Sequence, residues 1–223
     1  MKHFTLTICS AAVLLFSCNN DAEKKTDATT TDTTKVAQTP AATETKAPAA
    51  APDSATMMKN WMAYMTPGDV HKMMASWDGT WDVESTSWMA PGAPPTTSKG
   101  SSVNKMAMGG RYQVSNHKGT MMGQPFEGMS IIGYDNAKKM FVSTWIDNMG
   151  TGIMKMEGPW DESTKSMMLK GKCVDPSNGD GKEMDLREVF RVVDEKTQVM
   201  EMYGPGPDGK EFKMMELKFT KKS

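Results

Sequence analysis

Three residue types are scarce in this chain, and each shortage removes a class of function. The 223 residues include three cysteines, three histidines and three arginines. A metal site built from several cysteines is excluded, and His71 and His117 stand too far apart in the sequence to form a zinc site unaided. We therefore predict no metal-ligating residues.

An excess of one charge and a long apolar run are also missing. Lys and Arg number 26 against 27 Asp and Glu, which argues against nucleic-acid binding through bulk positive charge. No phosphate-binding loop, dinucleotide fingerprint or supported catalytic triad occurs. We predict no catalytic residues and no cofactor, and an enzyme is not favoured. After the N-terminus no run of 18 apolar residues occurs, so the mature chain is not expected to span a membrane.

The N-terminus has the features of a secretory signal. Lys2 and His3 precede the apolar run Phe4–Phe16, which is too short for a transmembrane helix. Leu15-Phe16-Ser17-Cys18 resembles a bacterial lipobox, so residues 1–18 are predicted to be a lipoprotein signal with Cys18 acylated. The alternative is an ordinary signal peptide with a chance cysteine. Because two or three acyl chains anchor stably, we expect a lipoprotein of the bacterial cell envelope, in the outer membrane.

The remaining cysteines and the following segment fit that location. Cys9 would leave with the signal, so Cys173 stays alone and no intramolecular disulfide forms. Residues 19–56 are rich in Thr, Ala and Pro and lack aromatic residues, which predicts a disordered tether. Asp32-Thr33-Thr34 and Asp53-Ser54-Ala55 resemble a bacterial O-glycosylation site, with Thr33 and Ser54 as the acceptors.

The folded part is expected to start with two short helices over 57–76. Apolar side chains recur at helical spacing from Met58. Thr66 is predicted to cap the second helix, with Pro67 in its first turn.

From residue 77 onward the pattern changes to alternation, with turn residues between the segments. Each gap is too short for a parallel crossover, so neighbouring strands should pair antiparallel. The economical solution is an up-and-down barrel over 77–223, and a two-sheet sandwich is the alternative. The expected strands are 79–89, 97–107, 111–121, 125–134, 139–147, 152–160, 166–174, 182–193, 197–203 and 211–221.

The expected strand 182–193 offers two faces. One carries Glu188 among Met, Leu, Phe and Val, and the other carries Arg187 and Arg191. The first face is more apolar and is predicted to point inward. Glu188 would then lie inside the barrel, where a carboxyl group needs a partner or stays protonated.

The predicted barrel resembles the DUF1579 family, a group of bacterial secreted or lipid-anchored domains of unknown function. The resemblance covers 77–222, and its opening phrase Gly79-Thr80-Trp81 and strand count also look like calycin barrels such as lipocalins and fatty-acid-binding proteins. That second likeness concerns the fold alone. The family phrases here are 77–81, 89–95, 109–112, 119–128, 133–136, 143–152 and 202–212.

Seven side chains are candidates for ligand binding. Trp81 provides either an aromatic floor or a plug at one barrel end. Trp145 lies in a strand before a glycine-rich turn, and Glu127 lies in a loop-like segment with several glycines. Each arginine is expected to form surface ion pairs, and the alternative is that one reaches inward and holds an acidic head group. The full set is Trp81, Arg111, Glu127, Trp145, Arg187, Glu188 and Tyr203.

Methionine is unusually frequent, with 24 residues. Thioethers bind Cu(I), but these methionines occupy positions where a strand needs an apolar residue, so adaptable core filling is favoured. A haem ligated by His117 alone is the weaker alternative.

Together the sequence favours a lipid-anchored barrel that binds a small apolar or amphipathic molecule. The alternative from another class is an envelope scaffold or interaction module without a ligand pocket.

The glycosylation hypothesis has a direct test. If Thr33 and Ser54 carry sugars, the intact mass of the mature protein will show hexose-sized increments. A mass that equals that of the acylated polypeptide would exclude the modification.

Overall fold

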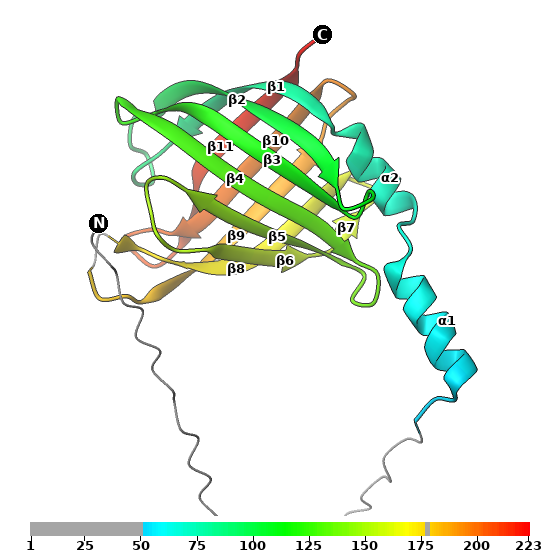
Figure 1. Ribbon diagram of the computed structural model, residues 1–223. Coiled ribbons are helices and arrows are strands. Elements are labelled where there is room, and N and C mark those ends of the chain that lie inside the picture. Colours follow the sequence, from blue (N-terminus) through cyan, green and yellow to red (C-terminus); the bar gives the residue numbers. More distant parts are fainter. Residues whose placement is uncertain (1–50, 177–178) are drawn as a thin grey trace, which may run out of the picture. The chain divides into compact units, whose positions relative to one another are not determined.

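The computed structural model describes residues 51–176 and 179–223 (Figure 1). The predicted signal peptide, Cys18, Thr33 and most of the tether lie outside the described residues. Residues from Ala50 onward form one compact unit. No helix among the described residues has the length and apolar content to cross a membrane.

Two helices precede the sheet: α1 (Ser54–Met65) and α2 (Asp69–Ser76). Helix α1 begins three residues before the expected position because the Asp53 carboxylate accepts a hydrogen bond from the Thr56 amide and caps it. The prediction that Thr66 caps α2 is wrong. Thr66 ends α1, where its hydroxyl donates to the Met62 carbonyl, and Gly68 precedes α2.

The expected strands are present, and their mutual pairings are all antiparallel. One expected strand, 152–160, is divided into two, because Pro159 has no amide hydrogen to donate to a ladder. The strands are β1 (Gly79–Ser87), β2 (Thr96–Ala107), β3 (Tyr112–Met121), β4 (Gln124–Asp135), β5 (Met140–Asp147), β6 (Met154–Gly158), β7 (Trp160–Asp161), β8 (Ser166–Val174), β9 (Glu183–Val192), β10 (Thr197–Pro205) and β11 (Glu211–Lys221).

The sheet closes on itself. Its order is β6-β5-β4-β3-β2-β1-β11-β10-β9-β8-β7, and β6 also pairs with β8. Ten strands therefore form a barrel, with β7 as a short extra strand on β8. Figure 1 shows the strands wrapping around a common interior. The prediction of a closed antiparallel barrel is confirmed, and the sandwich alternative is wrong.

Two glycines permit the closing contact between β6 and β8. A Cβ atom on Gly158 would collide with the Met168 carbonyl oxygen, and one on Gly171 would collide with the Lys155 carbonyl oxygen. These are backbone atoms, which cannot rotate away as a flexible side chain does. The two strands approach closely because neither position carries a side chain.

The apolar core is densest where α2 meets the barrel. Trp77 follows α2 and packs against Phe141, Trp160 and Phe190 at ring-centroid distances of 5.3 to 6.3 Å. Met156 and Leu169 are almost fully buried beside them. Methionine thus serves as a core residue, as its place in the strand pattern predicts.

Hydrogen bonds fix the end of α2 on the barrel. The Gln113 side-chain amide of β3 donates to the Met74 carbonyl and to Asp78, each at 2.9 Å. The Trp77 carbonyl accepts from the Trp81 indole at 3.0 Å and from Asn104 at 3.3 Å. These bonds satisfy carbonyl groups that a helix end leaves without partners. They fix the positions of Trp77 and Trp81, both of which are buried.

Barrel closure makes Gly158 a sensitive position. We expect Gly158→Ala to lower the free energy of unfolding by about 3 kcal/mol, because the new methyl group has to push backbone atoms apart. The matched control is Gly152→Ala, whose Cβ would meet no atom within 4 Å. Urea denaturation of both variants measures the difference. Equal stability of the two variants would show that β6 and β8 do not meet in this way.

Candidate ligand site inside the barrel

Glu188 points into the barrel, as its strand pattern predicts. Its neighbours along β9 on the same face are Leu186 and Phe190, and its partners on the adjoining strands are Leu169 and Met202. Among the described residues the carboxyl group makes no hydrogen bond or ion pair. A carboxyl group flanked by apolar side chains is the most unusual feature of the interior.

Burial raises the pKa of Glu188 to about 7. Burial disfavours the charged form, and no cation among the described residues compensates for the lost hydration. The group therefore changes charge close to neutral pH. It is a hydrogen-bond donor when protonated and a strong acceptor when ionised.

A second titratable group, His117, faces the interior from β3. Its direct partners on the adjoining strands are Ser102 and Gly128. Its ring lies 5.1 Å from the Trp145 ring and 6.3 Å from the Phe219 ring, centroid to centroid. Burial lowers the pKa of His117 to about 4, so the imidazole is neutral at physiological pH. From the sequence we considered His117 only as a haem ligand. Its place in an aromatic wall formed with Trp145, Phe126 and Phe219 was not predicted.

Trp145 is the centre of that aromatic wall. Its ring occupies the space that a side chain on Gly128 would need, and it stacks on Phe126 with an interplanar angle of 19°. The indole NH donates to Asp147 at 2.7 Å, and Asp147 also accepts from the Met149 amide. The ring is therefore held in one orientation by the turn that follows β5.

The two titratable groups come from opposite sides of the barrel. Strands β3 and β9 are five steps apart in the closed ten-strand order. Glu188, His117 and Trp145 all point inward yet are only half-buried. Side chains near α2, such as Phe141 and Leu169, are fully buried. Leu169 is also the direct strand partner of Glu188, so Glu188 lies beside this buried cluster, whereas His117 and Trp145 lie on other strands.

The other predicted ligand residues lie outside this interior. Arg111 is in the turn before β3 and donates to the carbonyls of Met65 and Met108. Glu127 points outward and forms an exposed ion pair with Lys118 at 3.1 Å. Arg191 also faces outward. None of the three arginines enters the barrel, and Arg187 and Arg191 form ion pairs on its surface, as the favoured prediction has it. The alternative of an inward arginine that holds an acidic head group is wrong.

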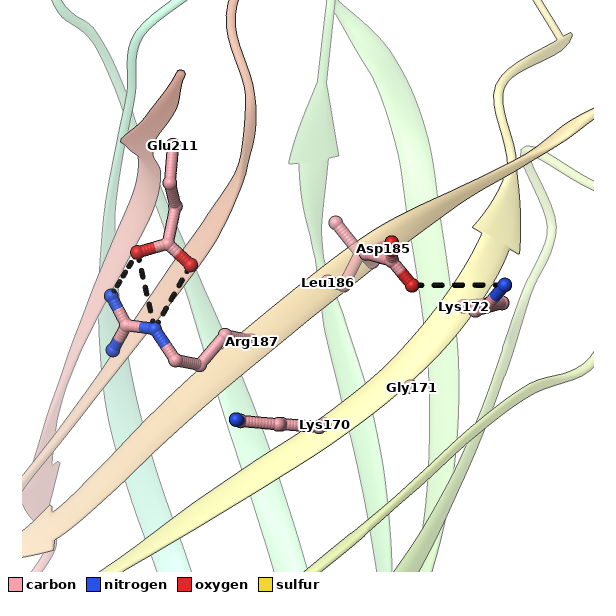
Figure 2. Close-up of a pocket in the computed structure, with 7 residues that line it drawn as sticks. All are labelled: Lys170, Gly171, Lys172, Asp185, Leu186, Arg187 and Glu211. Carbon is pink, nitrogen blue, oxygen red and sulfur yellow. Dashed lines mark hydrogen bonds and ion pairs between the residues drawn. The ribbon is translucent and has the colours of Figure 1, made fainter. Parts of the chain in front are cut away.

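Arg187 borders a hollow of about 620 Å³ on the outer face of β8 and β9 (Figure 2). Its guanidinium group forms a bidentate ion pair with Glu211 through both carboxylate oxygens and lies 3.8 Å from the centroid of the Tyr203 ring. The bond to Arg187 lowers the pKa of Glu211. Lys172 is paired with Asp185 at 3.8 Å. Because most of its charges are already paired, this hollow is a weak candidate for an ionic ligand.

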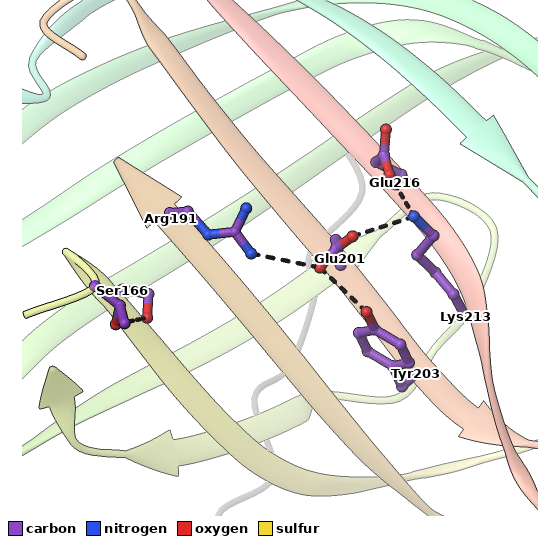
Figure 3. A network of polar contacts seen from close by, with 7 residues as sticks. Ser166, Arg191, Glu201, Tyr203, Lys213 and Glu216 are labelled. Carbon is purple, nitrogen blue, oxygen red and sulfur yellow. Dashed lines mark hydrogen bonds and ion pairs between the residues drawn. The ribbon is translucent and has the colours of Figure 1, made fainter. Parts of the chain in front are cut away.

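Tyr203 belongs to a polar network on the outside of β9 to β11 (Figure 3). Glu201 is its hub and contacts Tyr203, Lys213 and Arg191. Burial alone would raise the pKa of Glu201, but the hydrogen bonds from Lys213 and Tyr203 outweigh it and lower the pKa. The network ties three strands together and leaves no unpaired group for a ligand.

Comparison with known proteins places the barrel in a family. A family model described as "Protein of unknown function (DUF1579)" matches residues 66–221. The chain belongs to the DUF1579 family. No curated protein matches it.

Two solved structures resemble the DUF1579 barrel. The crystal structure of Rv2717c from M. tuberculosis has a TM-score of 0.52 and 9% identity, and the match covers 71% of this chain and 100% of that chain. A redesigned β-barrel has a TM-score of 0.35 and 14% identity, covering 67% and 95% of the two chains. The first likeness shows the fold alone. In the described part of this chain, no three His, Cys, Asp or Glu side chains gather as a metal site would require.

Burial of Glu188 and His117 affects stability in opposite directions. Folded Glu188 keeps its proton up to a pKa of about 7, whereas an unfolded glutamate loses it at about 4.3. The folded state thus binds the extra proton, and this group lowers stability as the pH rises through that window. His117 stays neutral in the folded chain down to about 4 but charges at about 6.5 when unfolded. It lowers stability as the pH falls from 6.5 to 4.

The two effects offset each other in the wild-type protein between about pH 4.5 and 6.5. In the Glu188→Gln variant only the effect of His117 remains. We expect the free energy of unfolding of this variant to fall by about 1.4 kcal/mol per pH unit on acidification, relative to wild type. His117→Gln should show the opposite slope. Urea denaturation at several pH values measures both. Curves parallel to wild type would mean that the two side chains face solvent.

Proposed function

We propose that this DUF1579 protein binds a small amphipathic molecule inside its barrel, and that acyl chains on Cys18 hold it at the bacterial cell envelope. The observation that supports the proposal is the unpaired carboxyl group of Glu188. A buried polar group without a partner costs free energy, so a ligand that hydrogen-bonds to Glu188 recovers part of that cost.

The surroundings of Glu188 favour the rest of the ligand being apolar. Met202 and Phe190 lie beside the carboxyl group, and Trp145 and Phe126 face the interior from β5 and β4. Methionine and aromatic side chains accept apolar ligands of varied shape. Because no arginine or lysine of the described residues faces Glu188 and His117 is neutral, an uncharged polar head such as a hydroxyl or amide fits better than an acid.

The chemistry does not favour an enzyme. Catalysis by Glu188 would need a second polar group close to the reacting atoms, and its direct neighbours are apolar. Binding and release of a molecule need only the groups that are present.

Ligand binding is tested by native mass spectrometry of the purified protein together with extraction of bound molecules. We expect a co-purifying molecule on the wild type and about a tenfold loss of occupancy in Glu188→Leu, since about 1.4 kcal/mol of binding is removed. Glu127→Leu is the matched control, because it makes the same substitution on the outer face. Equal occupancy in both variants, or an empty wild-type barrel, would refute the proposal.

Anchoring is tested separately through Cys18. The wild-type N-terminal peptide should begin at an acylated Cys18, and the protein should sediment with membranes. Cys18→Ala should abolish acylation and leave the chain unprocessed at this site. An N-terminal peptide that starts elsewhere and carries no lipid would contradict lipid anchoring while leaving the barrel proposal intact.

A further inference from the structure

Helix α1 exposes large apolar side chains that the barrel does not cover. No residue of the helix is buried. Met58 is 64% exposed, Trp61 60% and Met62 53%. Exposed apolar patches of this kind usually mark an interaction site.

The apolar residues of α1 gather on one side. With about 100° per residue, they fall in an arc of about 160°, and Lys59, Asn60 and Ala63 lie on the other side. The arc is as wide as that of a helix which packs on a protein core, yet no core lies against it. Its members are Met57, Met58, Trp61, Met62, Tyr64 and Met65.

The helix is fixed to the barrel at its C-terminal end. The Asn136 side-chain amide, in the turn between β4 and β5, donates to the carbonyls of Ala63, Tyr64 and Thr66 at 2.9 to 3.3 Å. The Arg111 guanidinium group donates to the Met65 carbonyl at 2.8 Å. Figure 1 shows α1 projecting past the barrel. These bonds use backbone carbonyls, so they position the helix and leave its side chains free.

The position of α1 in the chain favours a lipid surface as its partner. The segment before it leads back to Cys18, so α1 is the first described element after the proposed acyl anchor, and this step rests on the proposed anchoring. The helix contains no acidic side chain, and its one charged residue, Lys59, has no ion pair among the described residues. A bilayer with anionic lipids attracts such a helix, and Trp and Tyr favour the headgroup region.

We propose that the apolar face of α1 lies in the headgroup region of the membrane that holds the lipid anchor. Trp61, Met58 and Met62 enter the boundary between headgroups and acyl chains, and Lys59 stays at the polar side. The helix then sets the orientation of the barrel on the membrane, which acyl chains at the end of a long segment do not do by themselves.

The test uses the unacylated chain from residue 19 to its end, which keeps every described residue. Flotation with vesicles of phosphatidylethanolamine and phosphatidylglycerol measures binding. We expect the chain to float with the vesicles, and the double variant Met58→Asp/Trp61→Asp to bind about tenfold less or not at all. The control is Met89→Asp/Met122→Asp, which changes two exposed loop methionines and should bind like wild type.

The other outcomes are equally decisive. If wild type does not float, or if both double variants lose binding equally, α1 is not a membrane contact. A dimer by light scattering without vesicles, made monomeric by the α1 variant alone, would show that a second copy covers the face. If the chain does not bind vesicles but Cys18 is acylated in the cell, only the inference about α1 is overturned. Vesicle binding with an unmodified Cys18 overturns only the anchoring.

Discussion

The pairing of β6 with β8 is the constraint on which the rest of the structure depends. It converts a meander with two free edges into a closed barrel and gives the sheet an inside. Gly158 and Gly171 allow it, because any side chain there would meet backbone atoms of the opposite strand. Once the ring is closed, strand alternation separates neighbours in the sequence. Glu188 enters the interior, and Arg187 next to it joins the outer surface.

The strands, their antiparallel order and the inward face of β9 could be predicted from the sequence. Turn residues delimit each strand, and short connections leave only antiparallel neighbours. The division of the strand at 152–160 was not predicted, because the pattern continues through Pro159. The cap of α2 was misplaced because Thr66 suits a helix start, whereas its hydroxyl binds the Met62 carbonyl at the end of α1. The Asp53 cap of α1 was not predicted.

The candidate site could be predicted only in part. Alternation placed Glu188 correctly, but it does not say which side chains from distant strands meet. The sequence grouped Arg111, Glu127, Arg187 and Tyr203 with Glu188, whereas the structure distributes them over the outer surface. His117 was undervalued because its importance comes from Trp145 and Phe219, which belong to other strands. Partners across a barrel depend on the closing register, which no local pattern encodes.

The closed barrel holds the carboxyl group of Glu188 in its interior without a partner among the described residues. Carbon-13 NMR titration of the glutamate carboxyl groups tests it most directly, with Glu188→Gln to assign the signal. We expect a pKa of about 7 for Glu188, and a change in that pKa when a ligand is bound. A pKa near the ordinary glutamate value of about 4.3 would contradict it, because the carboxyl group would then be hydrated or paired.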